Sequence, residues 1–134
     1  MKLLLDTNIF LTAIFNQRHA AAAKKLLANT AHELSISIFS LHSIGLILLN
    51  RHQPGLWPRF LNDLILSGQV TVLILDNQYL ADVLKTAQSF NLDFDDAYQY
   101  LAAERNGLTL VSFDGDFDRT PRGRQTPQRI NRIT

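Results

Sequence analysis

The 134-residue chain contains no cysteine, which excludes disulfide bonds and every metal site built on thiolate ligands. Long hydrophobic runs are also missing. The most apolar stretch, Leu34–Leu49, is shorter than the ~20 residues of a membrane-spanning helix and includes serine and histidine. Near the N-terminus, Asp6 interrupts the apolar run and no small-residue cleavage site follows, so the segment does not resemble a secretion signal. These absences predict a cytoplasmic protein without a membrane anchor.

Acidic residues are missing from the end of the chain. After Asp118 the sequence contains five arginines and no aspartate or glutamate, whereas the first 118 residues hold 8 basic and 12 acidic residues. The net charge of +1 therefore conceals a basic tail at 119–134. A basic segment beside acidic residues suits a phosphate-rich partner, but a solvated arginine-rich end has the same composition. Composition alone leaves both interpretations open.

The chain does contain enough apolar residues for one buried core. Its hydrophobic share of 46% is ordinary for a globular protein, and its length most simply forms a single domain, 1–134. Short apolar runs predict strands at Lys2–Asp6, Leu34–Ile38, Val70–Leu75 and Leu108–Ser112, with Arg129–Thr134 as a candidate edge strand.

Helical patterns separate these predicted strands. They cover Thr7–Phe15, His19–Asn29, Ser40–Asn50, Arg59–Ser67, Asn77–Phe90 and a segment from Asp93 to Gly107. Short strands that alternate with helices predict an α/β fold, in which a parallel sheet is covered on both faces.

Half of the acidic residues flank one predicted helix–strand pair. Three precede the helix and three follow the strand: Asp93, Asp95, Asp96, Asp114, Asp116 and Asp118. A seventh, Asp6, ends the first predicted strand. In open parallel sheets, sites form at the carboxyl ends of the strands, so we expect Asp6 and Asp114 to lie close together. Crowded carboxylates repel one another unless a cation or water screens them.

Each carboxylate also has a simpler explanation. Asp6 and Asp93 can cap the helices that follow them, which stabilises a helix by about 1 kcal/mol. Asp96 in a first helical turn interacts favourably with the helix dipole, and Asp95 points about 100° away, toward solvent. The acids after the last strand can form turns; they resemble a calcium loop only in spacing, because Arg119 replaces the required glycine and the closing glutamate is missing. Taken together these explanations are weaker, because several unrelated capping and turn residues would all have to be acidic at chain segments that are predicted to lie close together.

Three motifs, in order along the chain, resemble those of the PIN domain family. They are Asp6-Thr7-Asn8 after a strand, Asp96-Ala97 at a helix start, and Ser112-Phe113-Asp114-Gly115-Asp116-Phe117 after a strand. The resemblance spans nearly the whole chain. It implies a three-layer α/β/α sandwich with a central parallel sheet of four to five strands, and a metal-dependent ribonuclease that is often dimeric. Many members are VapC-type toxins of toxin–antitoxin pairs, held inactive by an antitoxin.

The resemblance also assigns roles to single residues. The family's metal-site acids correspond to Asp6, Asp96 and Asp114, with Asp116 as an additional, more variable acid. The polar residues that support them correspond to Thr7, Asn8 and Ser112. One position departs from the pattern: Ser43 stands where the family usually has a glutamate. Neighbouring His42 would point about 100° aside and is a poor replacement, so the predicted cation site has one negative charge fewer.

Carboxylate oxygens at the assigned positions suit Mg²⁺ or Mn²⁺. Such an ion lowers the pKa of a bound water and neutralises charge in the transition state of phosphodiester cleavage. Arg119, Arg122 and Arg124 follow the acidic turn and are predicted to contact RNA phosphates. The resemblance further implies a homodimer and an antitoxin partner. Gly45 and Trp57 are expected mainly to pack, with a dimer or antitoxin contact as the alternative for Trp57.

Three functions of different classes therefore compete. The preferred one is a metal-dependent endoribonuclease, acting as a toxin or alone. The second is a degenerate PIN-like module that binds RNA or a protein without cleavage, which the serine at position 43 favours. The third, a phosphoryl-transfer enzyme or receiver domain, lacks support: the tail has no lysine, and the Asp-x-Asp motif of a phosphatase would need an acid at Asn8.

Overall fold

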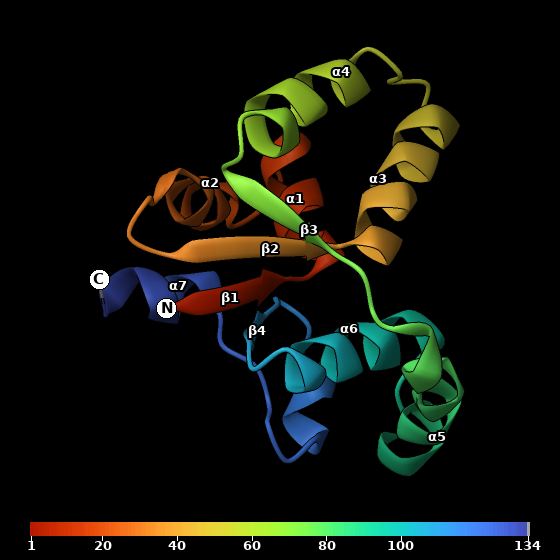
Figure 1. Cartoon of the computed structure of the whole chain (residues 1–134). Coiled ribbons are helices and arrows are strands. Elements are labelled where there is room, and N and C mark those ends of the chain that lie inside the picture. Colours follow the sequence, from red (N-terminus) through yellow and green to blue (C-terminus); the bar gives the residue numbers. More distant parts are fainter. Residues whose placement is uncertain (134) are drawn as a thin grey trace.

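The computed structural model describes residues 1–133 and shows a parallel sheet covered by helices on both faces (Figure 1). Within these residues the sheet has four strands in the order β3-β2-β1-β4: β1 (Lys2–Leu5), β2 (Glu33–Ser37), β3 (Val70–Leu73) and β4 (Thr109–Val111). All neighbouring strands are parallel. The predicted α/β class and three-layer sandwich are confirmed. This strand order places the carboxyl ends of β1 and β4 side by side, with Leu5 paired to Val111.

Helices connect the strands and continue beyond the last one. They are α1 (Thr7–Ile14), α2 (Ala20–Ala28), α3 (Ile38–Asn50), α4 (Leu56–Phe60), the π-helix η1 (Leu61–Leu66), the 3₁₀ turn η2 (Asn77–Tyr79), α5 (Leu80–Phe90), α6 (Phe94–Arg105), the 3₁₀ turn η3 (Gly115–Arg119) and α7 (Pro127–Arg132). None of the described helices is both long and apolar enough to cross a membrane.

Alternating residues of β1 divide the core into two layers. Leu3 and Leu5 point to one face of the sheet and pack with buried side chains of α1, α2, α3 and α7. Leu4 points to the other face and packs with α5 and α6. Successive side chains of a strand face opposite sides, so a strand buried on both faces must be apolar at each position. This explains why Leu3–Leu5 is a continuous apolar run.

The predicted edge strand at the C-terminus is wrong for the residues that the structure describes, because Pro127–Arg132 forms α7. The Thr126 side chain accepts a hydrogen bond from the Arg129 amide, and proline follows at the first turn. Both features start helices. Ile130 is fully buried against α1 and α2, which anchors this helix to the sheet face. Thr134, the last residue of the predicted strand, lies outside the described residues.

Other boundaries moved by a few residues. Helix α3 begins at Ile38 rather than Ser40, because the Ser37 hydroxyl caps it by accepting from the Ser40 amide. The expected helix Arg59–Ser67 starts earlier, at Leu56, and continues as η1. Trp57 packs as expected: it stacks on Phe60 and lies against Gly45, where a Cβ atom would come within 3.2 Å of the Trp57 ring.

Candidate metal centre

Asp6 connects β1 to α1 at the carboxyl edge of the sheet. Its amide donates to the Val111 carbonyl at 2.9 Å, which continues the pairing of β1 with β4. Its side chain is only 6% exposed. One carboxylate oxygen accepts from the Thr7 amide at 2.8 Å and the other from the Ser112 hydroxyl at 2.7 Å. Asp6 therefore caps α1 and is also held at the edge where β4 ends.

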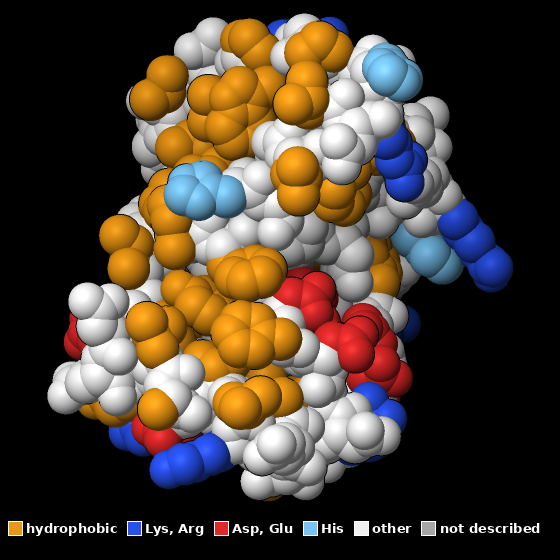
Figure 2. All heavy atoms as spheres, turned by 90° about the vertical axis from the view of Figure 1, so that its right-hand side faces the viewer, with side chains coloured by type: hydrophobic (Ala, Val, Ile, Leu, Met, Phe, Trp, Pro, Cys, Tyr) orange, Lys and Arg blue, Asp and Glu red, His pale blue; other side chains and the backbone are white. Residues whose placement is uncertain are grey.

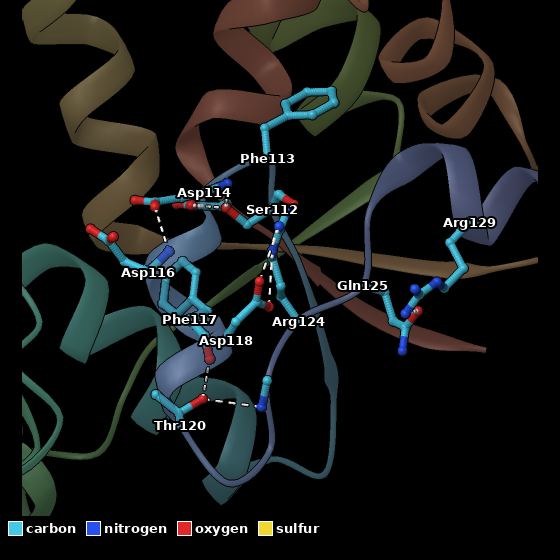
Figure 3. Close-up of polar contacts among 12 residues, drawn as sticks. Ser112, Phe113, Asp114, Asp116, Phe117, Asp118, Thr120, Arg124, Gln125 and Arg129 are labelled. Atoms are coloured by element: carbon cyan, nitrogen blue, oxygen red, sulfur yellow. Dashed lines mark hydrogen bonds and ion pairs between the residues drawn. The ribbon is translucent and has the colours of Figure 1, made fainter.

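Ser112 joins this first carboxylate to the acidic loop. Its hydroxyl donates to Asp6 and accepts from the Asn8 side-chain amide at 3.2 Å and from the Asp114 main-chain amide at 2.9 Å. The side-chain oxygen of Asn8 accepts a hydrogen bond from the main-chain amide of Phe113 at 3.3 Å. Asn8 and Ser112, separated by 104 residues, thus clamp the loop after β4 against the start of α1. Figure 3 shows this loop with Ser112, Asp114 and Asp116.

The loop brings three carboxylates together. Asp96, Asp114 and Asp116 each offer an oxygen, and these oxygens lie within 4.8 Å of one another. The Asp116 amide also donates to the Asp114 carboxylate at 2.8 Å, which holds the loop closed. Asp96 is shared with a second group at the start of α6, formed with Asp93 and Asp95. Hard carboxylate oxygens at this spacing fit a divalent cation such as Mg²⁺ or Mn²⁺.

Asp6 lies beside this cluster but, among the described residues, belongs to neither group of converging oxygens. The sequence predicts that Asp6, Asp96 and Asp114 position the ion directly or through water. In the structure both oxygens of Asp6 accept hydrogen bonds from the protein, from Thr7 and Ser112. Its charge still acts on the cluster, because repulsion from Asp6 raises the pKa of Asp96 and repulsion from Asp114 raises the pKa of Asp6.

Burial and crowding make these carboxylates hold protons more tightly. Burial raises the pKa of Asp96 to about 7, and repulsion from Asp6, Asp95 and Asp114 adds to the increase. Burial also raises the pKa of Asp6 to about 6, although the hydrogen bonds from Ser112 and Thr7 oppose the rise. A cation would relieve the repulsion and displace the protons.

A buried polar network lies behind the carboxylates and was not predicted. The Thr7 hydroxyl donates to the Ser40 hydroxyl at 2.7 Å, and the Gln99 side-chain amide donates to the same oxygen. Gln99 is 1% exposed, and its carbonyl oxygen has no partner among the described residues. The network joins α1, α3 and α6. A glutamine three residues after Asp96, on the same helical face, was the available signal.

Position 43 lies one helical turn after Ser40 in α3. Ser43 is partly buried, whereas His42 is exposed. Ser40 contributes a hydroxyl to the buried network with Thr7 and Gln99, and Ser43 stands where the resemblance expects a carboxylate.

The three arginines after the acidic loop differ in their surroundings. Arg119 forms an ion pair with Asp116 at 3.5 Å, and its side chain is 44% exposed. Arg124 is 18% exposed; it pairs with Asp118 at 3.3 Å and donates to the Ser112 carbonyl at 3.1 Å. Figure 3 shows Arg124 reaching back to Asp118 across the loop. Arg124 therefore braces the loop, while Arg119 is the more available cation.

Arg122 also binds the protein itself. Its guanidinium donates to the Leu108 carbonyl at 2.8 Å, and its main-chain amide donates to the Tyr100 hydroxyl at 3.4 Å. These contacts fasten the tail to the α6–β4 connection.

Comparison with known proteins gives a family and a fold. The family model described as PIN domain matches residues 3–123. No curated protein matches the chain.

Three solved structures with this fold are similar over most of their length. A toxin–antitoxin complex from Klebsiella pneumoniae has 23% identity and a TM-score of 0.68, covering 93% of this chain and 97% of that one. VapBC2 from Rickettsia felis, bound to a promoter DNA fragment, has 19% identity and a TM-score of 0.69, covering 94% and 97%. Mycobacterium tuberculosis VapC20, a toxin that cleaves the sarcin–ricin loop, has 20% identity and a TM-score of 0.72, covering 87% and 92%.

Proposed function

Because this chain belongs to the PIN domain family, we propose that it is a metal-dependent endoribonuclease that hydrolyses RNA phosphodiester bonds. The observation that carries the proposal is the convergence of Asp96, Asp114 and Asp116, whose oxygens lie within 4.8 Å of one another. Mg²⁺ is typically held by one or two carboxylates together with waters and substrate phosphate. In this cluster Asp116 is exposed to solvent, whereas Asp114 is partly buried and Asp96 is buried. Waters and a substrate phosphate can therefore reach an ion held by these carboxylates.

Each residue of the site has a role in this proposal. Asp96 and Asp114 hold the divalent ion, with Asp116 at the solvent side where RNA would approach. Asp6, fixed by Ser112, sets the negative potential beside them. When bound, the ion supplies a water of lowered pKa and positive charge against the phosphate in the transition state.

A cleavage assay tests this function directly. We expect the purified chain to cut single-stranded RNA with Mg²⁺ or Mn²⁺ and to stop when EDTA removes the metal. Asp114→Asn should reduce the rate by at least about 100-fold, because it removes charge that positions the ion. Asp82→Asn, an exposed change on α5, is the matched control and should cut normally. Equal activity in Asp114→Asn would assign cleavage to another site or a contaminant.

The alternative is a PIN module that binds RNA or protein without cleaving, and Ser43 is the observation that favours it. A site with one carboxylate fewer holds a cation less tightly. Under this alternative the wild-type chain binds RNA but does not cut it, and Ser43→Glu gains cleavage. Wild-type cleavage that depends on Asp114 would exclude it.

We further propose that Arg119 contacts RNA phosphates, since it is the more exposed arginine of the acidic loop. In an Asp114→Asn background, which prevents cutting, Arg119→Gln should lower the salt dependence of single-stranded RNA binding by about 0.7 in log–log slope. Lys85→Gln on α5 is the matched loss of charge and should leave the slope unchanged. The measurement is fluorescence anisotropy over a series of salt concentrations. An unchanged slope in Arg119→Gln would contradict the contact.

An exposed apolar face supports a homodimer. Leu46 and Leu49 of α3, Leu80 and Leu84 of α5, and Phe94 of α6 are exposed. Figure 2 shows hydrophobic side chains spread over this side of the molecule, with acidic side chains next to them. Exposed apolar side chains gathered on one face of a protein mark interaction sites. We expect a dimer by light scattering and a monomer after Leu84→Glu; a wild-type monomer at high concentration would contradict this.

A second apolar surface suits an antitoxin. A groove of about 420 Å³ lies between α1, α2 and α4–η1, with Lys24 and Arg59 among its lining residues. Its apolar lining includes Phe10, Ile14, Leu27, Phe60 and Leu64. The Klebsiella pneumoniae relative is a toxin–antitoxin complex, which supports an apolar antitoxin segment as the occupant. Co-purification with a small neighbouring gene product that blocks cleavage would support this proposal. If that inhibitor still binds the Leu64→Glu variant, the antitoxin binds outside this groove.

A further inference from the structure

Two aromatic rings from distant parts of the chain stack beside the acidic loop. The rings of His19 and Phe113 have centroids 5.8 Å apart and planes 22° from parallel. His19 comes from the connection between α1 and α2, and Phe113 directly precedes Asp114 in the loop after β4. Figure 3 shows the Phe113 ring on the opposite side of this loop from Asp118.

The inner ring is held rigidly. Phe113 is partly buried against the core layer that contains α1 and α2. Its main-chain amide donates to the Asn8 side chain at 3.3 Å, which fixes the backbone that carries the ring beside Ser112 and Asp114. A stacking platform needs such a fixed base, because a mobile ring loses conformational entropy whenever a ligand binds to it.

The outer ring is exposed and is also held by its backbone. His19 has a φ of 72°, in the left-handed region that side chains other than glycine rarely adopt. Its carbonyl accepts from the Ala23 amide at 3.2 Å, and the Gln17 amide donates to the Thr12 carbonyl at 3.1 Å. These bonds fix the connection on both sides of His19. Strained backbone of this kind is concentrated at ligand sites, and here it places an imidazole ring over Phe113 in a residue that is exposed to solvent.

We propose that the His19–Phe113 pair is a stacking subsite for a nucleobase of single-stranded RNA, next to the phosphate that the carboxylate cluster would bind. This rests on the proposed nuclease function. Single-stranded RNA is recognised by stacking of unpaired bases on aromatic side chains, histidine included. Because Phe113 and Asp114 are consecutive, a nucleotide whose phosphate lies at Asp114 has its neighbouring base within reach of this pair. Exposed Arg18, which precedes His19, provides a cation for the adjoining phosphate.

Chemically altered RNA separates stacking from phosphate binding. The probes are a fluorescein-labelled oligoadenylate and an oligomer of equal length that has the ribose–phosphate backbone but no bases. Affinities are measured by anisotropy in the Asp114→Asn background. The preference for the oligoadenylate should fall about 5-fold or more in His19→Ala and in His19→Leu. Leucine keeps an apolar cover over Phe113 but has no π face. His19→Phe should keep the preference, because it keeps the ring.

The baseless oligomer also serves as the folding control, since its affinity should be the same for all four proteins. The subsite is refuted if His19→Ala and His19→Leu keep the same preference for bases as the protein that retains His19. It is also refuted if both oligomers bind more weakly and with a smaller salt slope, which would make His19 a phosphate contact. If the unaltered chain cuts RNA but shows no base preference, only the subsite fails. If it neither binds nor cuts RNA, the proposed function fails and the subsite with it.

Discussion

The metal-free protein is expected to lose stability as the pH rises from about 4 to about 8. Asp6 and Asp96 have folded-state pKa values of about 6 and about 7, against 3.8 for an ordinary aspartate. At a pH above 3.8 and below these folded-state pKa values, both aspartates keep their protons in the native state and have lost them in the unfolded state. The free energy of unfolding therefore falls with pH until both groups are ionised, and is constant above that. Since each pKa unit corresponds to about 1.4 kcal/mol, we expect a loss of roughly 3 kcal/mol from Asp6 and roughly 4 kcal/mol from Asp96, on the order of 7 kcal/mol together.

Urea denaturation in EDTA, at a series of pH values, measures this loss. Addition of Mn²⁺ should restore stability, and more strongly at high pH, because the ion binds the ionised carboxylates. The shift in melting temperature on adding Mn²⁺ should therefore grow from about pH 5 to about pH 8. Rising stability of the metal-free protein over the same range would contradict the raised pKa values. No Mn²⁺ shift at high pH would count against the metal site itself.

Asp96→Asn should stabilise the metal-free protein and inactivate it. The carboxylate is 9% exposed and is crowded by Asp6, Asp95 and Asp114. Removing the charge relieves that cost, so unfolding at about pH 8 should require about 2 to 4 kcal/mol more free energy. The same change removes a proposed metal ligand. We expect the Mn²⁺ shift to shrink to near zero and RNA cleavage to fall by at least about 100-fold.

The matched control for this variant is Asp95→Asn. It removes the same charge from the neighbouring residue, but Asp95 is exposed and lies outside the cluster of Asp96, Asp114 and Asp116. It should change stability by less than about 0.5 kcal/mol and keep both the Mn²⁺ response and the cleavage. If Asp96→Asn and Asp95→Asn behave alike, the site depends on general negative charge and not on a ligand at position 96. A destabilised Asp96→Asn protein would show that burial does not penalise this carboxylate.

Much of the fold could be predicted from local patterns. The continuous apolar run Leu3–Leu5 is typical of a strand buried on both faces, and β1 lies in the middle of the sheet. The C-terminal error has an equally local reason: the helix-start signals Thr126 and Pro127 lie just before the segment predicted as a strand. The exact ends of α3 and α4 depended on caps and packing that the pattern of apolar residues does not encode.

The candidate site was predictable in its carboxylates but not in their contacts. Asp96, Asp114 and Asp116 converge because α6 leads into β4 and packs against it, which brings the start of α6 near the loop after β4. The hydrogen bond from the buried amide of Gln99 to Ser40 was missed, because a contact between residues so far apart leaves no local signal. The support of Asp6 by Ser112 was expected only from the family resemblance, for the same reason.

The sequence by itself determined the α/β class, the order of strands and helices along the chain and the identity of the acidic residues, because apolar periodicity and residue type act over a few neighbouring positions. Only the tertiary structure decided which carboxylates share a space, which of Arg119 and Arg124 remains available, and that His19 covers Phe113. These contacts depend on how the segments that follow β1 and β4 are placed relative to each other. The packing of whole helices against the sheet sets that geometry, and no short segment contains it.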